Sequence, residues 1–400
     1  MPGRAETLTA APFAQSGAPA VLMHLRVLAV IAAESVSGPA RQLASLVAPL
    51  SSQGIELEVA IPWRVGRPRP DFASHLERHG VPTHLIEDRG PLDFRLADRL
   101  STLVRDRRCD VLQTHSYKAT AAAWWLRRRG LSVPWIGFYH GHTTETLRAH
   151  VYHRLDRAML LAADRVVVMS ERQRQQFPRA GDRIQIVHNA VVDLPQGSRP
   201  LPPSPPRVAT RSRIGVIGRL SPEKGVDIFL DACTILLERG MEFDALIVGD
   251  GVQRERLEKS AAALGLLNER VHFLGHLPAS RALYEDLDLV VIPSRTEGLP
   301  NVLLEAIGVG RLVVATNVGA IPEVLGGTRA GILVQSGDAA SLAAAIEDAL
   351  TISDQNRVLD DQAALRDRFS LERRAAAHAN LYRTLIAARD ATMAQRPETT

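Results

Sequence analysis

The stretch DLVVIPSRTEGLPNVLLEA, residues 288–306, decides the fold because it holds a strand, a turn and a helix in that order. Its apolar beginning, 288–294, has the length of a buried strand. The proline of the turn suits the first turn of a helix, which we expect at 301–310. Glu297 in the turn and Glu305 in the helix are either two acids at a sugar site or parts of a solvated surface.

The same alternation of strands and helices continues on both sides of this stretch. In the first half we expect strands at 26–32, 55–62, 82–87, 110–116, 134–141 and 164–170. In the second half we expect them at 213–220, 243–251, 271–276, 288–294, 312–319 and 330–335. Such alternation is typical of parallel sheets with helices on both faces. The predicted fold class is therefore α/β, with two doubly wound Rossmann-like domains facing a central cleft.

A proline-rich seam, 193–213, separates the two halves and cannot form a helix or a central strand. The first helix is expected at 38–54 and the last at 371–393. The predicted organisation is a disordered lead at 1–20, an N-terminal domain at 21–195, a linker at 196–212, a C-terminal domain at 213–368 and a final helical segment at 369–395.

The composition, 46% hydrophobic and 23% charged, is that of a globular protein. No run of eighteen apolar residues occurs, so no transmembrane helix is expected. Cys109 and Cys233 fall in different predicted domains, which favours free thiols and a cytoplasmic location. Residues 1–206 carry 26 Lys and Arg against 18 Asp and Glu. This excess predicts an anionic partner, unless the chain simply prefers arginine.

The loop after the first strand of the second half carries two cations. In GVIGRLSPEKG, 215–225, the strand runs into Gly218, and Arg219 and Lys224 follow five residues apart. Cations beside a glycine suit a diphosphate, and they equally suit an ordinary solvated loop. The stretch has neither Walker A spacing nor the dinucleotide-binding glycine spacing, so neither mechanism is predicted.

A second glycine-rich turn lies at the end of the following strand. VGDGVQRERLE, 248–258, places Gly249 and Gly251 between a strand and a helix. Both glycines permit a tight backbone near a ligand, and they equally suit a plain turn.

The helix that begins near Pro300 is expected to present free backbone N–H groups over residues 298–302. Such a helix terminus attracts phosphate or sugar oxygens. Glu297 precedes it, and Glu305 lies about one and a half turns inside the helix. Since carboxylates accept hydrogen bonds from neighbouring sugar hydroxyls, we expect separate roles for the two acids.

Five motifs of the second half resemble those of the retaining GT-B glycosyltransferases of family 4 (group 1). They occur in that family's order and spacing: GRLSPEKG, VGDGVQRERLE, VHFLGHL, DLVVIPSRTEGLPNVLLEA and ATNVGAIPEVL. The first half resembles the family more loosely, through SVSGPARQLASL and DVLQTHSYKA. The resemblance implies that the C-terminal domain binds a nucleotide-sugar and that the N-terminal domain binds the acceptor. It also implies that the final helix crosses back to the first domain.

The resemblance implies a donor site with a role for each residue. Arg219 and Lys224 would neutralise the donor diphosphate and help the leaving group without a metal. Glu305 would bind the ribose hydroxyls, Glu297 would lie by the sugar, and Gly38 would lie close to the diphosphate. The rest of the implied site is Gly218, Gly249, Gly251, Gly298, Leu299, Pro300, Asn301 and Val302.

The acceptor side is expected at the end of the strand that closes with VLQTH. Its His115 matches a family histidine near the acceptor hydroxyl, and a strand's carboxyl end is where such a site forms. Lys118, His140 and His142 are expected to line the same side. No metal is expected, because these histidines lack zinc-ligand spacing. Asp286 and Asp288 have the spacing of a metal-binding acid pair in GT-A transferases. They directly precede a strand at which the GT-B pattern also carries Asp, which favours a structural role. The candidate catalytic residues are His115, Arg219, Lys224 and Glu297.

The predicted function is transfer of a sugar from a UDP-sugar or GDP-sugar to a hydroxyl, with retention and with no required cofactor. A glycan or a polyprenyl-diphosphate-linked acceptor, and a role in surface polysaccharide or glycolipid synthesis, are expected. The predicted location is cytoplasmic and peripheral on the inner face of the membrane. Trp124 and Trp125 beside the arginines of 127–129 suit an anionic membrane surface, although a buried helix face with a basic end that complements the helix dipole explains them somewhat better.

Two other classes remain open from the sequence. A nucleotide-sugar epimerase or a phosphorylase would use the same two-domain fold. A basic protein that binds membranes or nucleic acid would explain the pI of about 9.4. No nucleic-acid-binding motif occurs, so nucleic acid is not an expected partner.

Overall fold

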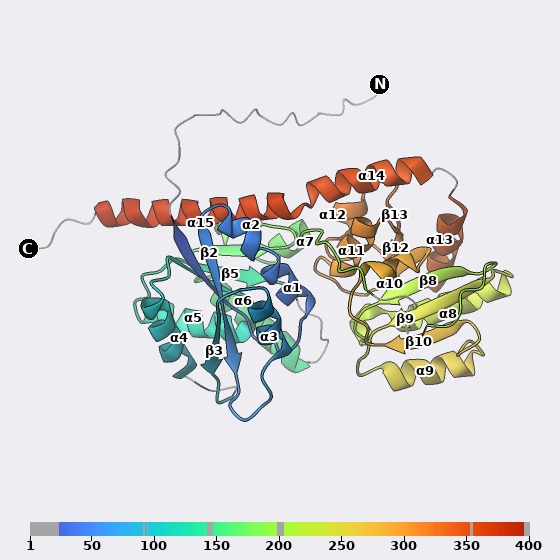
Figure 1. The fold of residues 1–400 in the computed structure, drawn as a ribbon, viewed down its shortest axis with the longest axis horizontal. Helices are drawn as coiled ribbons and strands as arrows, with labels where there is room; N and C mark the ends of the chain where they lie inside the picture. Colours follow the sequence, from blue (N-terminus) through green and yellow to red (C-terminus); the bar gives the residue numbers. More distant parts are fainter. Residues whose placement is uncertain are drawn as a thin grey trace, which may run out of the picture.

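The computed structural model describes residues 24–90, 93, 95–141, 147–197, 204–352 and 355–395. The lead expected at 1–20 and the candidate acceptor residue His142 lie outside these ranges. The described chain forms two parallel sheets, one in each half, with helices packed around both (Figure 1).

The N-terminal sheet has seven strands in the order β3-β2-β1-β4-β5-β6-β7. The strands are β1 (Leu25–Val30), β2 (Ile55–Trp63), β3 (Thr83–Glu87), β4 (Val111–Thr114), β5 (Trp135–Tyr139), β6 (Arg165–Val168) and β7 (Ile184–Ile186). The helices are α1 (Gly38–Ala44), α2 (Val47–Ser51), α3 (Asp71–Arg78), α4 (Arg95–Asp106), α5 (Tyr117–Arg128), α6 (Leu147–Leu160) and α7 (Glu171–Arg174).

The C-terminal sheet has six strands in the order β10-β9-β8-β11-β12-β13. The strands are β8 (Ser212–Ile217), β9 (Phe243–Val248), β10 (Val271–Gly275), β11 (Leu289–Ile292), β12 (Leu312–Thr316) and β13 (Gly331–Val334). The helices are α8 (Val226–Glu238), α9 (Arg254–Ala263), α10 (Arg281–Glu285), α11 (Asn301–Val309), α12 (Ile321–Leu325), α13 (Ala339–Thr351), α14 (Gln355–Arg368) and α15 (Leu371–Ala394).

The strand order reverses between β1 and β4 in one sheet and between β8 and β11 in the other. Ligands of open parallel sheets bind at such reversals, at the carboxyl ends of the strands. All four strands are almost entirely buried, as expected for parallel strands covered on both faces. The loops that leave these strands therefore carry the candidate site.

Several local elements differ from the sequence prediction, among them the short helix α7, which was not predicted. The helix expected at 38–54 is two short helices, because the ring of Pro49 excludes a helical hydrogen bond to the carbonyl one turn earlier, at Ser45. Helix α14 was not predicted, since its residues are polar on most faces. Strand β7 was not predicted, since it has only three residues.

Arginines from the linker side bind the acids that precede β11. Arg207 Nη2 lies 2.6 Å from Asp288 Oδ1, and the backbone N–H of Arg213 donates to the same carboxylate. The Arg213 side chain forms an ion pair with Asp286. These two acids therefore anchor the chain that enters the C-terminal sheet. Among the described residues, no group of three or more His, Cys, Asp or Glu side chains is arranged to hold a metal ion.

The last helix, α15, returns from the C-terminal half to the N-terminal one. In Figure 1, α14 and α15 run in sequence along one edge of both halves. Ala375, Ala379 and Leu385 of α15 are buried, and the helix packs against α2. Within the described ranges, no helix is both long and apolar enough to cross a membrane.

Candidate active site

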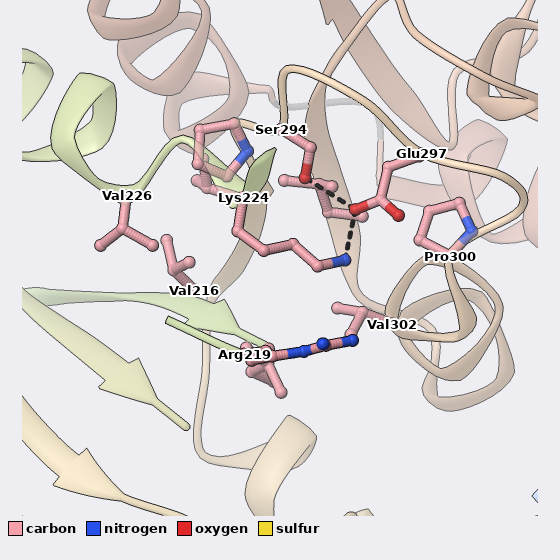
Figure 2. A pocket seen from close by; sticks show the side chains of 13 residues that line it. Val216, Arg219, Lys224, Val226, Ser294, Glu297, Pro300 and Val302 are labelled. Atoms are coloured by element: carbon pink, nitrogen blue, oxygen red, sulfur yellow. Dashed lines mark hydrogen bonds and ion pairs between the residues drawn. The ribbon is translucent and has the colours of Figure 1, made fainter. Parts of the chain in front are cut away.

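A pocket opens at the carboxyl ends of β8 and β11, with an empty volume of about 310 Å³. Lys224, from the loop after β8, points into it and meets Glu297, from the loop after β11. The Lys224 Nζ atom lies 2.6 Å from Glu297 Oε1, and Ser294 Oγ donates to the same oxygen at 2.7 Å (Figure 2). The Glu297 side chain is 6% exposed, so its charge is compensated by these two donors.

Arg219 is the second cation of this pocket. Its guanidinium reaches toward the same space as the Lys224 ammonium, with Pro300 and Val302 on the other side (Figure 2). The side chain is exposed, and no ion pair joins it to another described residue. Two cations thus face one pocket, and only Lys224 is engaged by a carboxylate. An anion with more than one charge would fit this arrangement.

Helix α11 begins at the rim of this pocket, and the N-terminal domain meets it there. A Cβ atom added to Gly38 would lie 2.2 Å from Asn301 Nδ2, so a larger residue there would have to displace the Asn301 side chain. Asn189 Nδ2 donates to the carbonyl of Leu299 and to Asn301 Oδ1, both at 3.3 Å. Two segments of the N-terminal half therefore contact the first residues of α11.

Glu305 lies further along α11, outside the lining of the pocket, and is held by two partners. Tyr284 of α10 donates its hydroxyl to Oε2, and burial, together with Glu305, raises the pKa of Tyr284 well above its usual value. Arg41 of α1 pairs with Oε1 at 2.9 Å. The Arg41 contact joins the two domains.

Of the remaining predicted glycines, Gly218 lines the pocket, and Gly249, Gly251 and Gly298 pack closely against neighbouring backbone. A Cβ atom on Gly249 would lie 1.8 Å from the Gly218 carbonyl oxygen, and one on Gly251 would lie 2.4 Å from that of Leu220. Gly298 lies against the backbone carbonyl of His140. Gly249 and Gly251 thus allow the loops after β8 and β9 to lie close together, and Gly298 allows the loop after β11 to lie against the loop after β5.

Two histidines form the predicted acceptor side. His115 Nδ1 and His140 Nε2 are 3.0 Å apart, and the His115 ring stacks on Phe138 with centroids 4.3 Å apart. Burial holds the pKa of His115 well below its usual value and that of His140 at about 4. Both rings are therefore neutral at pH 7, so within the pair one nitrogen donates and the other accepts.

Lys118 lies in the first turn of α5, three residues after His115. Its ammonium forms an ion pair with Asp88, and its side chain is 17% exposed. The lysine is therefore not a free cation for an acceptor in this arrangement.

The sequence did not single out Arg41, Tyr284, Asn189 or Ser294 as site residues. Arg41 follows Gly38 by three residues, which places it in the first turns of the same helix. This three-residue spacing from Gly38 was the one pattern in the sequence that could have pointed to Arg41 as a site residue. Ser294 lies in the stretch 288–306, three residues before Glu297, whereas Asn189 and Tyr284 come from other segments. No local pattern marked any of these three as a site residue.

Two family models match the chain. The model described as Glycosyltransferase Family 4 matches residues 36–193, and the model described as Glycosyl transferases group 1 matches residues 211–351. The chain belongs to the group 1, family 4 glycosyltransferases. The predicted family is thereby confirmed.

Individual members of this family align with parts of the chain. A lipopolysaccharide core biosynthesis mannosyltransferase of Rhizobium leguminosarum is 32% identical over 186 residues, which cover 44% of this chain and 52% of the relative. A D-inositol 3-phosphate glycosyltransferase of Corynebacterium urealyticum is 34% identical over 182 residues, 43% of each chain. The chain thus spans about half the length of these curated relatives, or less.

Solved structures of similar fold cover nearly the whole chain. The Anabaena HepE protein, solved with UDP, superposes with a TM-score of 0.73 at 20% identity, over 90% of this chain and 100% of that one. Sucrose-phosphate synthase from Thermosynechococcus elongatus gives a TM-score of 0.75 at 19% identity, over 91% and 100%. These likenesses confirm the predicted GT-B fold.

Proposed function

We propose that the protein is a glycosyltransferase that moves a sugar from a nucleotide-diphosphate donor to an acceptor hydroxyl with retention of configuration. The observation that carries this proposal is the pair of cations, Lys224 and Arg219, in one pocket at the start of α11. Glu305 lies in the same helix. A diphosphate at the pocket and a ribose at Glu305 would match one nucleotide-sugar.

The cations would act on the leaving group. As the glycosidic bond breaks, negative charge grows on the nucleotide diphosphate, and preorganised cations stabilise that charge. Lys224 is held in place by Glu297, so its ammonium is oriented before the donor arrives. Arg219 is free to close on the bound diphosphate. Glu297 would then position Lys224 and the sugar.

Glu305 would receive the ribose hydroxyls. A carboxylate offers about four lone-pair directions, and Arg41 and Tyr284 use one on each oxygen. One direction on each oxygen is left for the two neighbouring hydroxyls of a ribose. The donor proposed is a UDP-sugar or a GDP-sugar, and the HepE structure solved with UDP supports a uridine donor.

The acceptor would enter beside His115 and His140. Neutral imidazoles donate and accept hydrogen bonds, so the pair is suited to orient a hydroxyl. A glycan acceptor agrees with the Rhizobium relative, whose name assigns it to lipopolysaccharide core biosynthesis. Surface polysaccharide or glycolipid synthesis is the proposed setting.

A donor screen tests this function. The purified protein is incubated with UDP- and GDP-sugars and with glycan acceptors, and nucleotide release and product are measured. We expect one donor to be used, with the anomeric configuration of the product retained in its NMR spectrum. An epimerase would change the donor without consuming it by transfer. Absence of nucleotide-sugar turnover, together with salt-sensitive DNA binding, would refute the proposal.

We further propose an anionic membrane as a partner of the face formed by α5 and α6. Tyr117 and Tyr152 are 52% and 53% exposed, and their rings lie 5.7 Å apart. Leu155 is 53% exposed on α6, and the Arg128 guanidinium lies 4.3 Å from the Trp124 ring centroid. Exposed aromatic and aliphatic groups beside arginines suit a lipid headgroup boundary.

Vesicle flotation tests this second proposal. The wild-type protein should float with vesicles that contain anionic lipid, and a Tyr152→Ser, Leu155→Ser variant should float less. Equal flotation of wild type and variant, or no flotation of either, would contradict it.

A further inference from the structure

Helix α15 carries three buried polar side chains at intervals of four residues. Arg374, His378 and Tyr382 are at most 6% exposed and lie on one face of the helix. Tyr382 donates its hydroxyl to Gln113 Oε1 at 2.8 Å, and the His378 ring stacks on Phe138, with centroids 5.5 Å apart. This polar stripe faces the N-terminal domain behind its candidate acceptor residues.

Arg374 is the residue of this stripe whose burial is least favourable, because it carries a charge. Its side chain is buried, and no carboxylate pairs with it anywhere in the described ranges. Burial lowers the pKa of Arg374 to about 10, so the guanidinium stays charged at neutral pH. Buried cations without an acid are rare because desolvation of the charge is unfavourable. A neutral side chain of similar size would avoid this desolvation cost. The buried charge of Arg374 therefore calls for a reason other than stability.

The guanidinium of Arg374 donates hydrogen bonds to one residue, Gln42 of α1. Arg374 Nη1 donates to the Gln42 carbonyl at 2.8 Å and to Gln42 Oε1 at 2.5 Å. The amide of Gln42 also forms two bonds with the backbone of Ala190. Nε2 donates to the Ala190 carbonyl at 2.8 Å, and Oε1 accepts from the Ala190 N–H at 3.0 Å. Gln42 therefore joins α15, α1 and the segment after β7.

Both segments held by Gln42 contact α11 at the proposed donor site. In α1, Gly38 lies against Asn301 and Arg41 pairs with Glu305. In the segment after β7, Asn189, the neighbour of Ala190, donates to Asn301 and to the Leu299 carbonyl. The Gln42 amide, to which Arg374 donates, thus links the two segments that contact α11 and the residues just before it.

We propose that Arg374 is a positioning residue that, through Gln42, holds α1 and Asn189 against the N-terminus of α11 in the geometry that binds the donor. This inference rests on the proposed function. It assigns to the C-terminal helix a part in donor binding, besides its packing against the N-terminal domain. A purely structural Arg374 would affect stability and leave the donor KM unchanged.

The test compares Arg374→Met with Arg373→Met. Arg373 is the neighbouring residue, exposed, and paired with Asp367 at 2.7 Å, so it matches the substitution without reaching Gln42. Nucleotide release is measured against donor and acceptor concentration, at a temperature at which both variants are fully folded by circular dichroism. We expect Arg374→Met to raise the donor KM about tenfold, which corresponds to about 1.4 kcal/mol. We expect the acceptor KM and kcat to change less than threefold, and Arg374→Lys to restore part of the loss.

A second variant keeps the inference testable if Arg374→Met does not fold. Gln42→Met removes the same link from the other side and should raise the donor KM in the same way. The inference is overturned if the folded variants keep the donor KM of wild type and Arg373→Met while wild type turns over. It is also overturned if donor KM, acceptor KM and kcat change together. Absence of wild-type turnover with every donor would instead overturn the proposed function.

Discussion

Arg41 and Glu305 form an ion pair at 2.9 Å that joins α1 of the N-terminal domain to α11 of the C-terminal domain. Glu305 is only 8% exposed at its side chain, and Tyr284 occupies its other oxygen. The carboxylate is therefore fixed by one residue from each half of the molecule. The proposed ribose site is complete only when the two domains lie as they do here.

Removal of Arg41 should weaken donor binding. Arg41→Met leaves Glu305 with a single partner and loses a contact that orients it. We expect the donor KM to rise about fivefold to tenfold, equivalent to about 1–1.4 kcal/mol, with kcat almost unchanged. The exposed Arg105→Met serves as control. Tighter donor binding in Arg41→Met would show that Arg41 competes with the ribose and would contradict this account.

Tyr284→Phe should lower stability and leave the fold intact. The change removes only a hydroxyl, but it leaves a buried carboxylate oxygen with one partner fewer. Such a loss costs about 1–3 kcal/mol of unfolding free energy. Urea unfolding should show a lower midpoint with an unchanged slope. An unchanged midpoint would mean that the Tyr284 contact with Glu305 does not stabilise the protein.

Lys224→Met should mainly slow the chemical step. The ammonium would stabilise charge that develops on the leaving diphosphate, and loss of one such donor typically lowers kcat by about 10²–10³. Lys259→Met is the matched control, because Lys259 also pairs with a glutamate at 2.6 Å but at an exposed site, on α9. Wild-type kcat in Lys224→Met would remove Lys224 from the mechanism.

Stability should fall as the pH drops from about 6.5 toward 4. Burial lowers the pKa of His115, His140 and His378 below the ordinary value of 6.5, and that of His140 to about 4. At a pH between a histidine's lowered pKa in the folded chain and its ordinary pKa in the unfolded chain, the unfolded chain binds more protons. Protonation therefore favours unfolding. Each histidine contributes up to about 1.4 kcal/mol per pH unit there.

Unfolding midpoints at pH 7 and pH 5 measure this dependence. His378→Phe should reduce the difference between the two midpoints, because one of the three buried imidazoles is replaced by a ring that cannot be protonated. An equal difference in wild type and variant would show that His378 does not contribute to the pH dependence.

The sequence predicted the sheets, and it singled out several residues that line the pocket, among them Arg219, Lys224 and Glu297, because both depend on local order. Strand, glycine and cation follow one another within 215–225, and the turn and helix follow within 288–306. The topology then brings the two loops to one edge. Lys224 and Glu297, singled out separately, meet there at 2.6 Å.

The contacts between the domains could not be predicted in this way. Arg41, Gln42 and Arg374 become neighbours of the site only through the relative placement of the two sheets and the return of α15. No spacing along the chain encodes that placement. A retrospective signal exists in α15, where Arg374, His378 and Tyr382 interrupt an alanine-rich helix at intervals of four. Helix α14 could not be predicted for a different reason, because its mostly polar residues show no clear apolar stripe at helical spacing.

The central claim is that the start of α11, together with Glu305 and Lys224, binds the nucleotide diphosphate of a sugar donor. Isothermal titration of UDP and GDP into wild type, Lys224→Met and Glu305→Gln tests it most directly. The account predicts that one nucleotide binds wild type once per chain, and that Glu305→Gln weakens its binding by about tenfold or more, about 1.4 kcal/mol. Failure of both nucleotides to bind wild type, or equal affinity in all three proteins, would contradict it.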